Sequence, residues 1–346
     1  MKVAIITDQH FGARKNSKLF HDFFLKFYNE VFFPTLKREK ITAVIDMGDT
    51  FDNRTGINFS ALSWAKKNYY DRLQEMGVKV YTIVGNHTAY YKNTNSINAV
   101  DLLLREYNNV YVIPEYEECE VGGLNIAMVP WINQENETST YSSLEKTKCP
   151  VVMGHLELQG FYANRQHLME HGAARTPYAK FKKVFSGHYH HRSTEDNINY
   201  LGNPYEIYWS DLEEIRGFHI FDTETLETTP INNPFRMFYR LYYEDTPHQT
   251  FNFSEYKDKI VKLIVRKKTD PKKFEQFVDK MMDSGLADLK VVENFAINES
   301  EEFNIEQSED TLSILSRYLD ESETDVDKNA VKDIIRNIYQ EACEVI

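Results

Sequence analysis

Two histidines in alternate positions follow a short apolar stretch in the middle of the chain. The stretch covers residues 184–186 and breaks at Gly187, after which come His188 and His190. Side chains two residues apart lie on the same face of a strand, so a strand that continued past the glycine would direct both imidazoles to one point. This arrangement indicates a metal site, although an isolated pair of this kind is more often found in a surface loop.

The same order of apolar stretch and polar side chains recurs four more times towards the N-terminus. Strands are expected over residues 3–7, 42–47, 78–84 and 150–153. The polar residues that follow them are, in the same order, Asp8 with His10, Asp49 with Asp52, Asn86 with His87, and His155. Because open α/β sheets form their sites at the carboxyl ends of strands, we expect these side chains to meet.

Helices and further strands complete a pattern of the α/β class. Apolar residues at helical spacing predict helices over residues 20–36, 59–76 and 96–107. Shorter strands are expected over residues 110–113, 125–131, 183–186, 199–201 and 217–222.

Five short motifs stand in a fixed order, namely DxH at residues 8–10, GDxxD at 48–52, GNH at 85–87, GH at 154–155 and GHxH at 187–190. Their order and spacing resemble those of the calcineurin-like metallophosphoesterases. Flanking sequences such as TIVGNH, MGHLELQGFY and SGHYH resemble the SbcD-type DNA repair nucleases, in particular the phage recombination endonuclease subunits. The resemblance covers residues 1 to about 230, and it implies a metallophosphoesterase β-sandwich of mixed sheets flanked by helices.

The resemblance also implies two divalent metal ions. One set of ligands would be Asp8, His10, Asp49 and His190, and the other would be Asp49, Asn86, His155 and His188, with Asp49 bridging. Oxygen and imidazole ligands without thiolate suit manganese, iron or zinc, and manganese is the ion we expect. Two such ions can hold a phosphodiester and lower the pKa of a bound water from about 15.7 towards about 7.

His87 and Asp52 are the candidate catalytic residues. By the resemblance, His87 would position the scissile phosphate and protonate the leaving oxygen. Asp52 matches the last carboxylate of GDxxD, but its position is also compatible with a helix N-cap or a turn.

Thr88 stands where the family usually has an acidic residue after GNH, which puts the orientation of His87 in question. His191 should point away from the metals by strand parity, as a structural or solvent-facing residue.

A small α+β unit is expected after the motif-bearing domain, which we place at residues 1–230. Strands over residues 236–244, 260–265 and 289–292 and a helix over 271–284 would form it, within a segment of 231–296. SbcD-type nucleases carry a DNA-capping domain at this place. Eight basic and two acidic residues lie between residues 256 and 273, which favours either contact with DNA phosphates or a solvated face. The candidate DNA-binding residues are Lys262, Arg266, Lys267 and Lys268.

The last fifty residues are expected to form an acidic linker over 297–310 and a helical segment over 311–346. The apolar residues of this segment recur at helical spacing, and those that we expect to bind a partner are Leu312, Leu315, Leu319, Ile334, Ile335 and Ile338. In the nucleases that the chain resembles, such a helix pair binds an SbcC-type SMC-like ATPase. The alternative is that the helices pack on the chain's own cap.

Composition restricts the class of protein. A content of 42% apolar and 14% aromatic residues argues against disorder. The net charge of -13 is largely local, since residues 297–327 hold eleven acidic residues and one arginine, so it does not exclude DNA. Three widely spaced cysteines without a CxxC motif fit a reducing compartment. We find no stretch that would span a membrane, and we expect a cytoplasmic protein, in the host cytoplasm if the chain is phage-encoded.

The leading hypothesis is a metal-dependent DNA nuclease subunit, with exonuclease and single-strand endonuclease activity. It would process DNA ends in recombination and double-strand-break repair within an ATP-driven SbcCD-type complex, as a homodimer inside a heterotetramer. One alternative is a metallophosphoesterase for small nucleotides or phosphoproteins, which would not need the C-terminal helices. The other is a catalytically weak scaffold that clamps DNA for the ATPase, which only Thr88 favours.

Overall fold

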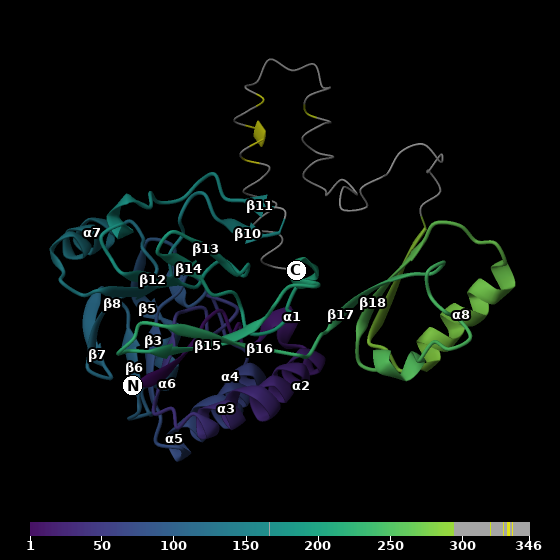
Figure 1. Cartoon of the computed structure of the whole chain (residues 1–346), viewed down its shortest axis with the longest axis horizontal. Coiled ribbons are helices and arrows are strands. Elements are labelled where there is room, and N and C mark those ends of the chain that lie inside the picture. The colour runs from purple at the N-terminus through teal and green to yellow at the C-terminus, as the bar shows by residue number, and fades with distance from the viewer. Residues whose placement is uncertain (166, 294–318, 320–327, 329–330, 333, 335–346) are drawn as a thin grey trace. The chain divides into compact units, whose positions relative to one another are not determined.

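The computed structural model describes residues 1–165, 167–293, 319, 328, 331–332 and 334. The expected linker and most of the expected C-terminal segment, with Leu312, Leu315, Ile335 and Ile338, lie outside the described residues. The chain divides into two compact units (Figure 1). The first unit consists of Met1–Tyr239, Tyr256–Ile260 and Gly285–Asp288, and the second consists of Arg240–Glu255, Val261–Ser284 and the described residues from Leu289 onwards.

Two six-stranded mixed sheets form the centre of the first unit. The first sheet has the order β16 (Thr228–Asn232), β15 (Gly217–Asp222), β1 (Lys2–Ile6), β2 (Ala43–Asp46), β3 (Lys79–Ile83) and β6 (Val110–Ile113). The second has the order β13 (Ser193–Glu195), β14 (Ile198–Tyr200), β12 (Lys183–Ser186), β9 (Val151–Gly154), β8 (Leu124–Val129) and β7 (Glu117–Val121). In both sheets the central strands run parallel, whereas β15, β16, β13 and β7 pair antiparallel.

The alternation of side chains along the strands builds the layers. In β1, Val3 and Ile5 belong to the core between the two sheets, whereas Ala4 and Ile6 belong to the core under the helices. In β9, Val151 likewise faces the space between the sheets. Because successive strand residues point to opposite faces, each central strand contributes to two cores. The expected class, α/β with a β-sandwich of mixed sheets flanked by helices, is therefore confirmed.

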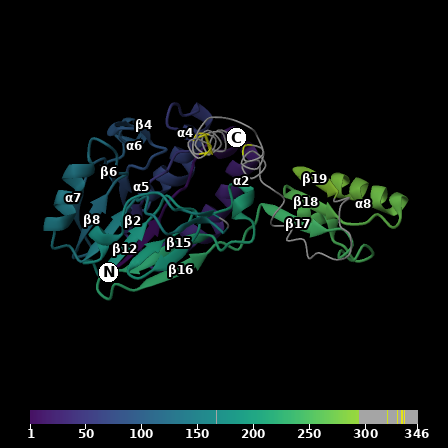
Figure 2. The same cartoon turned by 90° about the horizontal axis from the view of Figure 1, so that it is seen from above.

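Two long helical stretches cover the outer face of the first sheet. The first is α2 (Lys18–Phe27), which continues through a π-helical turn at Tyr28–Phe32 into α3 (Phe33–Arg38). The second is α4 (Phe59–Ala65), which continues through a π-helical turn at Lys66–Tyr70 into α5 (Asp71–Glu75). The second sheet is covered by α7 (Glu137–Lys146), on the opposite side of the sandwich (Figures 1 and 2). The helices predicted over 20–36 and 59–76 are thus confirmed.

The helix predicted over 96–107 is wrong in its first part. Residues 96–98 end β5 (Thr94–Asn98), which forms a hairpin with β4 (Ala89–Tyr91), and α6 covers only Ala99–Leu104, so the helix also ends earlier than predicted. The side chain of Asn98 accepts a hydrogen bond from the main-chain nitrogen of Asp101, so the helix begins after Asn98. Short elements complete the unit, namely α1 (Ala13–Asn16), β10 (Tyr162–Asn164), β11 (His167–Leu168) and single turns at Thr176–Tyr178 and Trp209–Asp211.

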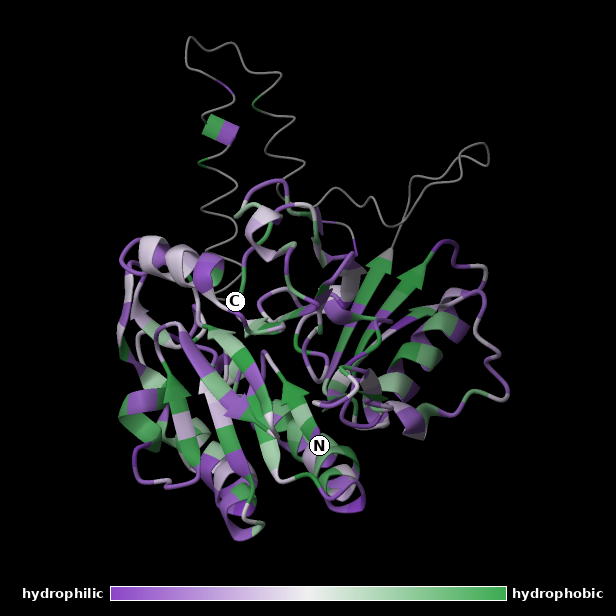
Figure 3. Cartoon of the chain, turned by 60° about the vertical axis from the view of Figure 1, so that its left-hand side comes forward, coloured by the Kyte–Doolittle hydropathy of each residue, from purple (hydrophilic) through white to green (hydrophobic). Residues whose placement is uncertain are grey.

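A three-stranded sheet and one helix form the small α+β unit. The strands have the order β17 (Phe238–Tyr242), β18 (Ile260–Val265) and β19 (Asp288–Glu293), and the helix is α8 (Pro271–Asp283). Asp270 caps α8, and Phe274, Phe277 and Met281 of α8 are buried. Figure 3 shows hydrophobic strands and a helix with both hydrophobic and hydrophilic residues, as expected for one sheet covered on one face. Among the described residues, no helix is long and apolar enough to cross a membrane.

Candidate metal centre

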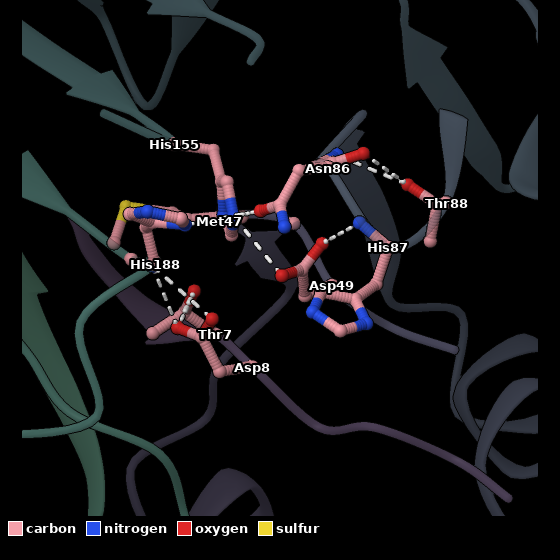
Figure 4. A network of polar contacts seen from close by, with 12 residues as sticks. Thr7, Asp8, Met47, Asp49, Asn86, His87, Thr88, His155 and His188 are labelled. Carbon is pink, nitrogen blue, oxygen red and sulfur yellow. Dashed lines mark hydrogen bonds and ion pairs between the residues drawn. The ribbon is translucent and has the colours of Figure 1, made fainter. Parts of the chain in front are cut away.

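Five loops that follow parallel strands meet at one edge of the sandwich. In each loop the first of the predicted site residues lies within three residues of the end of the strand. Asp8 and His10 follow β1, Asp49 follows β2, Asn86 and His87 follow β3, His155 follows β9, and His188 and His190 follow β12. Parallel neighbouring strands end at the same edge, so the loops converge (Figure 4). All seven predicted metal ligands and His87 are therefore brought together.

One group of ligand atoms consists of Asp8, His10 and His190. Their ligand atoms all lie within 4.8 Å of one another. Nε2 of His10, which is buried, lies 3.1 Å from Nε2 of His190, which is half-buried. The lone pairs of two ring nitrogens repel at this distance, so a proton on one of them or a bound cation would stabilise the contact.

A second group consists of Asp49, His155 and His188, with Asn86 at its centre. Oδ2 of Asp49 lies 3.1 Å from Nε2 of His155. Oδ1 of Asn86 lies 2.9 Å from the same nitrogen and 3.0 Å from Nδ1 of His188. Asp49 thus belongs to this group, and its bridging role to the first group stays a prediction.

His188 and His190 do not aim at one point, so the strand-parity argument is wrong. β12 ends at Ser186, and His188 has a φ of 81°, which takes the chain out of the strand. One histidine therefore joins the Asn86 group and the other joins Asp8 and His10. Positive φ angles also occur at Asp8 (52°), His10 (46°) and Asp49 (50°). Such angles cost of the order of 1–3 kcal/mol each and persist where the surrounding structure enforces them.

Glycines in the motifs permit the close approach of the loops. A Cβ atom on Gly187 would collide with Oγ1 of Thr7 and come within 2.8 Å of Oδ2 of Asp8. A Cβ atom on Gly85 would collide with the carboxylate of Asp49 and lie 2.5 Å from its main-chain nitrogen. A side chain at either position would displace a predicted ligand.

The outer nitrogens of two predicted ligands are held by the protein. Nδ1 of His10 lies 3.1 Å from Oδ1 of Asp52, and Nδ1 of His155 donates to the carbonyl of Met47 at 2.9 Å. These contacts leave both Nε2 atoms directed into the centre, as is usual for metal-bound histidines. The alternative of Asp52 as a helix cap is wrong, because Asn58 caps α4.

The pKa values of His10 and His155 are raised, whereas those of His188 and His190 are lowered. Burial alone would lower the pKa of His10, but the hydrogen bond and charge of Asp52 raise it to about 9. His155 behaves in the same way, since Asp49 outweighs burial and raises its pKa to about 9. Burial and the neighbouring charge of His155 lower the pKa of His188 to about 3. Burial also holds the pKa of His190 well below its usual range.

This donor set fits divalent cations. Burial raises the pKa of Asp8, whereas the charges of His155 and His87 outweigh burial at Asp49 and hold its pKa well below the usual range. Neutral His188 and His190 and an ionised Asp49 are already in the protonation state that metal ligands need. A bound cation would replace the proton that otherwise separates the facing nitrogens of His10 and His190. Each of the two groups offers imidazole and oxygen atoms, which are ligands that suit one divalent ion of the expected pair.

His87 stands at the edge of the centre with one ring nitrogen available. Its main-chain nitrogen donates to Oδ1 of Asp49 at 2.8 Å. Its Nδ1 lies 2.6 Å from the carbonyl of Asp52, which only accepts, so Nδ1 carries the proton. His10, Asp52 and His87 offer ligand atoms within 4.8 Å of one another. The hydroxyl of Thr88 contacts the main chain of Gly85 at 3.0 Å and closes the loop, so His87 is oriented by Asp49 and Asp52 instead.

Two arginines that the sequence analysis did not consider support the centre. Nη2 of Arg54 donates to the carbonyl of Asn86 at 2.5 Å, and the guanidinium lies 5.6 Å from the ring centroid of Trp131. Arg216 is 3% exposed and donates through Nη1 to the carbonyl of His190. An arginine two residues after GDxxD and another before the GFHIFD strand were visible in the sequence, but nothing in their spacing indicated these contacts.

Acidic partners hold Arg216 in place. Its Nη2 lies 3.0 Å from Oδ1 of Asp211 and 2.9 Å from Oε2 of Glu214. Glu214 also lies 3.1 Å from Nδ1 of His191. His191 thus contacts a carboxylate beside the centre, and its structural or solvent-facing role stays a prediction.

Residues 1–192, more than half of the chain, match the sequence profile described as calcineurin-like phosphoesterase. The chain belongs to the calcineurin-like phosphoesterases. This family depends on divalent metal ions, which agrees with the ligand groups described above. The chain is also 28% identical over 348 residues to exonuclease subunit 1 of Enterobacteria phage T4, with 99% of this chain and 100% of the relative covered.

Among solved structures, similar phosphoesterases include an archaeal phosphodiesterase and a dimetal phosphatase from Danio rerio. The first has a TM-score of 0.36 and 13% sequence identity, covering 67% of this chain and 100% of that one. The second has a TM-score of 0.35 and 13% identity, covering 64% of this chain and 91% of that one.

The predicted DNA-binding residues lie in the small α+β unit. Arg266 lies 3.2 Å from Asp245 and over the ring of Tyr242, and Nζ of Lys268 lies 4.4 Å from the ring centroid of Phe274. Lys262 is half-buried in β18, and burial lowers its pKa. Their contact with DNA stays a prediction, as does that of Lys267. Of the predicted partner-binding residues, Leu319 and Ile334 are described as helical, and Ile334 is exposed.

Proposed function

We propose that this chain is a metal-dependent DNA nuclease, with exonuclease and single-strand endonuclease activity. The observation that carries the proposal is the meeting of two groups of imidazole and oxygen ligands with His87 at their edge. A 28% identity along nearly the whole chain to a phage exonuclease subunit supports DNA as the substrate.

Asp8, His10 and His190 would hold one divalent ion, and Asn86, His155 and His188 would hold the other, with Asp49 between them. Manganese is the ion that we propose, since the donor set is oxygen and imidazole only. Bound ions of this kind supply a water that ionises near neutral pH and a positive field for the phosphate oxygens.

The protein's own groups position the substrate and handle protons. With Nδ1 held by Asp52, Nε2 of His87 is free to donate a proton when the ring is charged. We assign to it the contact with the scissile phosphate and the protonation of the leaving oxygen. Asp52 acts through His10 and His87 as a positioning residue. Arg54, held by the carbonyl of Asn86, adds a positive charge beside the centre.

We further propose that the chain acts as a subunit. The relative is named a subunit, which supports a complex with other subunits. The partner that we propose is an SbcC-type SMC-like ATPase, with a homodimer of this chain within a heterotetramer. The α+β unit would serve as a DNA cap and the segment 311–346 would bind the ATPase, in the processing of DNA ends for recombination and double-strand-break repair in the cytoplasm.

The test is the degradation of end-labelled double-stranded and single-stranded DNA with manganese, with metal content measured in parallel. Wild type is expected to cut. His87→Ser should keep its metal and lose cutting by about 10²–10⁴-fold, since it removes one proton donor. His171→Ser, at an exposed histidine, is the matched control and should cut like wild type. Metal-loaded wild type that cleaves a simple phosphodiester but leaves DNA intact, with or without the ATPase, would exclude the nuclease proposal.

A further inference from the structure

A cavity of ≈450 Å³ opens to solvent in the first unit. Its volume lies within the range of ligand pockets, about 300–1,000 Å³. Three aromatic residues contribute to its lining, namely Trp131, Tyr141 and Tyr178. Two carboxylates, Glu137 and Glu157, line it as well. None of these residues belongs to the predicted ligand set.

Two contacts connect this cavity to the candidate metal centre. Glu157 follows His155 by two residues, and its Oε2 lies 3.9 Å from Nε2 of His188. Trp131, which also lines the cavity, lies under the guanidinium of Arg54, which donates to the carbonyl of Asn86. The cavity therefore adjoins the group formed by Asn86, His155 and His188, the residues grouped in Figure 4.

The lining suits a flat aromatic ring and not a phosphate. Aromatic side chains provide faces for stacking, which contributes about 1–3 kcal/mol per base in single-strand binding. Tyr178 is fully buried, so the half-buried rings of Trp131 and Tyr141 are the ones that can offer a face for stacking. The carboxylates of Glu137 and Glu157 repel a phosphate, whereas they can accept hydrogen bonds from an amino group.

We propose that this cavity binds the base of the nucleotide next to the scissile phosphate, and that it prefers a base with an exocyclic amino group. The inference rests on the proposed function, because a phosphodiester held at the metal centre would present its adjoining nucleoside to the cavity. Glu137 and Tyr141 lie four residues apart on α7, so one face of this helix supplies the acceptor and the stacking surface.

The test compares three kinds of p-nitrophenyl phosphodiester with manganese. Deoxycytidine and thymidine esters, each linked through the 3′ or the 5′ oxygen, differ at C4, where cytosine has an amino group and thymine an oxygen, and also in the proton on N3 and the methyl group on C5. Methyl p-nitrophenyl phosphate lacks a nucleoside. Wild type is expected to hydrolyse the deoxycytidine ester with a kcat/KM about tenfold above that of the thymidine ester, as for carboxylate recognition of cytosine.

Variants on α7 separate the acceptance of a hydrogen bond by Glu137 from the stacking by Tyr141. Glu137→Gln should bring the ratio of the two nucleoside esters to about one, because an amide can also donate to the thymine oxygen. Tyr141→Leu should lower kcat/KM for both nucleoside esters about tenfold and leave the methyl ester unchanged. Glu145→Gln, an exposed glutamate on the same helix outside the lining, is the matched control and should behave like wild type.

Two results would overturn the inference. Equal rates for the two nucleoside esters in wild type would show that the cavity does not select an exocyclic amino group. Variants that lower the methyl ester as much as the nucleoside esters would show that the cavity binds no base. In both cases hydrolysis of the esters by wild type would still support the proposed phosphodiesterase activity. Failure of metal-loaded wild type to hydrolyse any of the esters would overturn both proposals together.

Discussion

The carboxylate of Asp52 lies 3.1 Å from Nδ1 of His10, on the side of the ring opposite to the nitrogen that faces His190. A carboxylate in this position orients a ligand imidazole and increases its basicity. Asp52→Asn keeps the size of the side chain and the main-chain contact with His87. We expect the affinity for manganese to fall about 10–100-fold, measured by titration of metal-free protein. An unchanged affinity would mean that Asp52 does not orient a ligand.

Gly85 tests the close packing of the motif loops. The added methyl group of Gly85→Ala would collide with the carboxylate of Asp49, so we expect the loss of bound metal and of activity. The matched control is Gly56→Ala, because a methyl group there meets nothing within 4 Å. Metal content by elemental analysis distinguishes the two variants. Full metal occupancy in Gly85→Ala would show that Asp49 is not needed as a ligand.

Arg216 is expected to carry much of the stability of the loop that holds His190. Arg216→Met leaves the buried carboxylate of Asp211 without its ion-pair partner and Glu214 with only Arg165 and His191, so the free energy of unfolding should fall by about 3–5 kcal/mol. Urea unfolding of metal-free protein measures this change. Arg165→Met, at a half-exposed arginine 3.5 Å from the same Glu214, should cost at most about 1 kcal/mol. Similar losses in both variants would contradict the special role of Arg216.

His219 should make the fold sensitive to acid. The side chain is buried in β15, and its burial, aided by the charge of Arg192, lowers its pKa to about 3. The unfolded chain takes up a proton near pH 6.5, whereas the folded protein does so only near pH 3. Stability is therefore complete above about pH 7 and decreases as the pH falls, by about 2 kcal/mol at pH 5.

The variant His219→Leu should remove this part of the pH dependence. Nδ1 of His219 has no hydrogen-bond partner among the described residues, so leucine breaks no bond at that atom. Urea unfolding between pH 5 and pH 8 gives the slope for both proteins. A slope that is the same in wild type and in the variant would mean that His219 is charged in the folded state.

The positions of the predicted ligands followed from the sequence because they depend on the ends of strands. Asp8, Asp49, Asn86 and His155 each follow an apolar stretch that the structure confirms as a parallel strand, and parallel strands bring their ends together. Local periodicity also predicted the long helices and the elements of the α+β unit.

Contacts between distant segments were not predictable in the same way. His188 and His190 separate because a positive φ follows the strand, and no periodicity in the sequence signals that turn. The ion pairs of Arg216 depend on the tertiary packing of a loop without regular structure. Residues 96–98 directly precede the apolar pattern of α6, and only the cap at Asn98 marks where β5 ends and the helix begins.

The proposed hydrolysis of DNA at this metal centre can be tested directly. The most direct measurement is the cleavage of end-labelled DNA by protein stripped with a chelator and reloaded with known amounts of manganese, for wild type and Asp49→Asn. We predict that stripped protein does not cut, that activity returns as bound manganese approaches two ions per chain, and that Asp49→Asn neither binds the pair nor recovers. Cleavage that persists in stripped protein, or recovery by Asp49→Asn equal to wild type, would contradict the account.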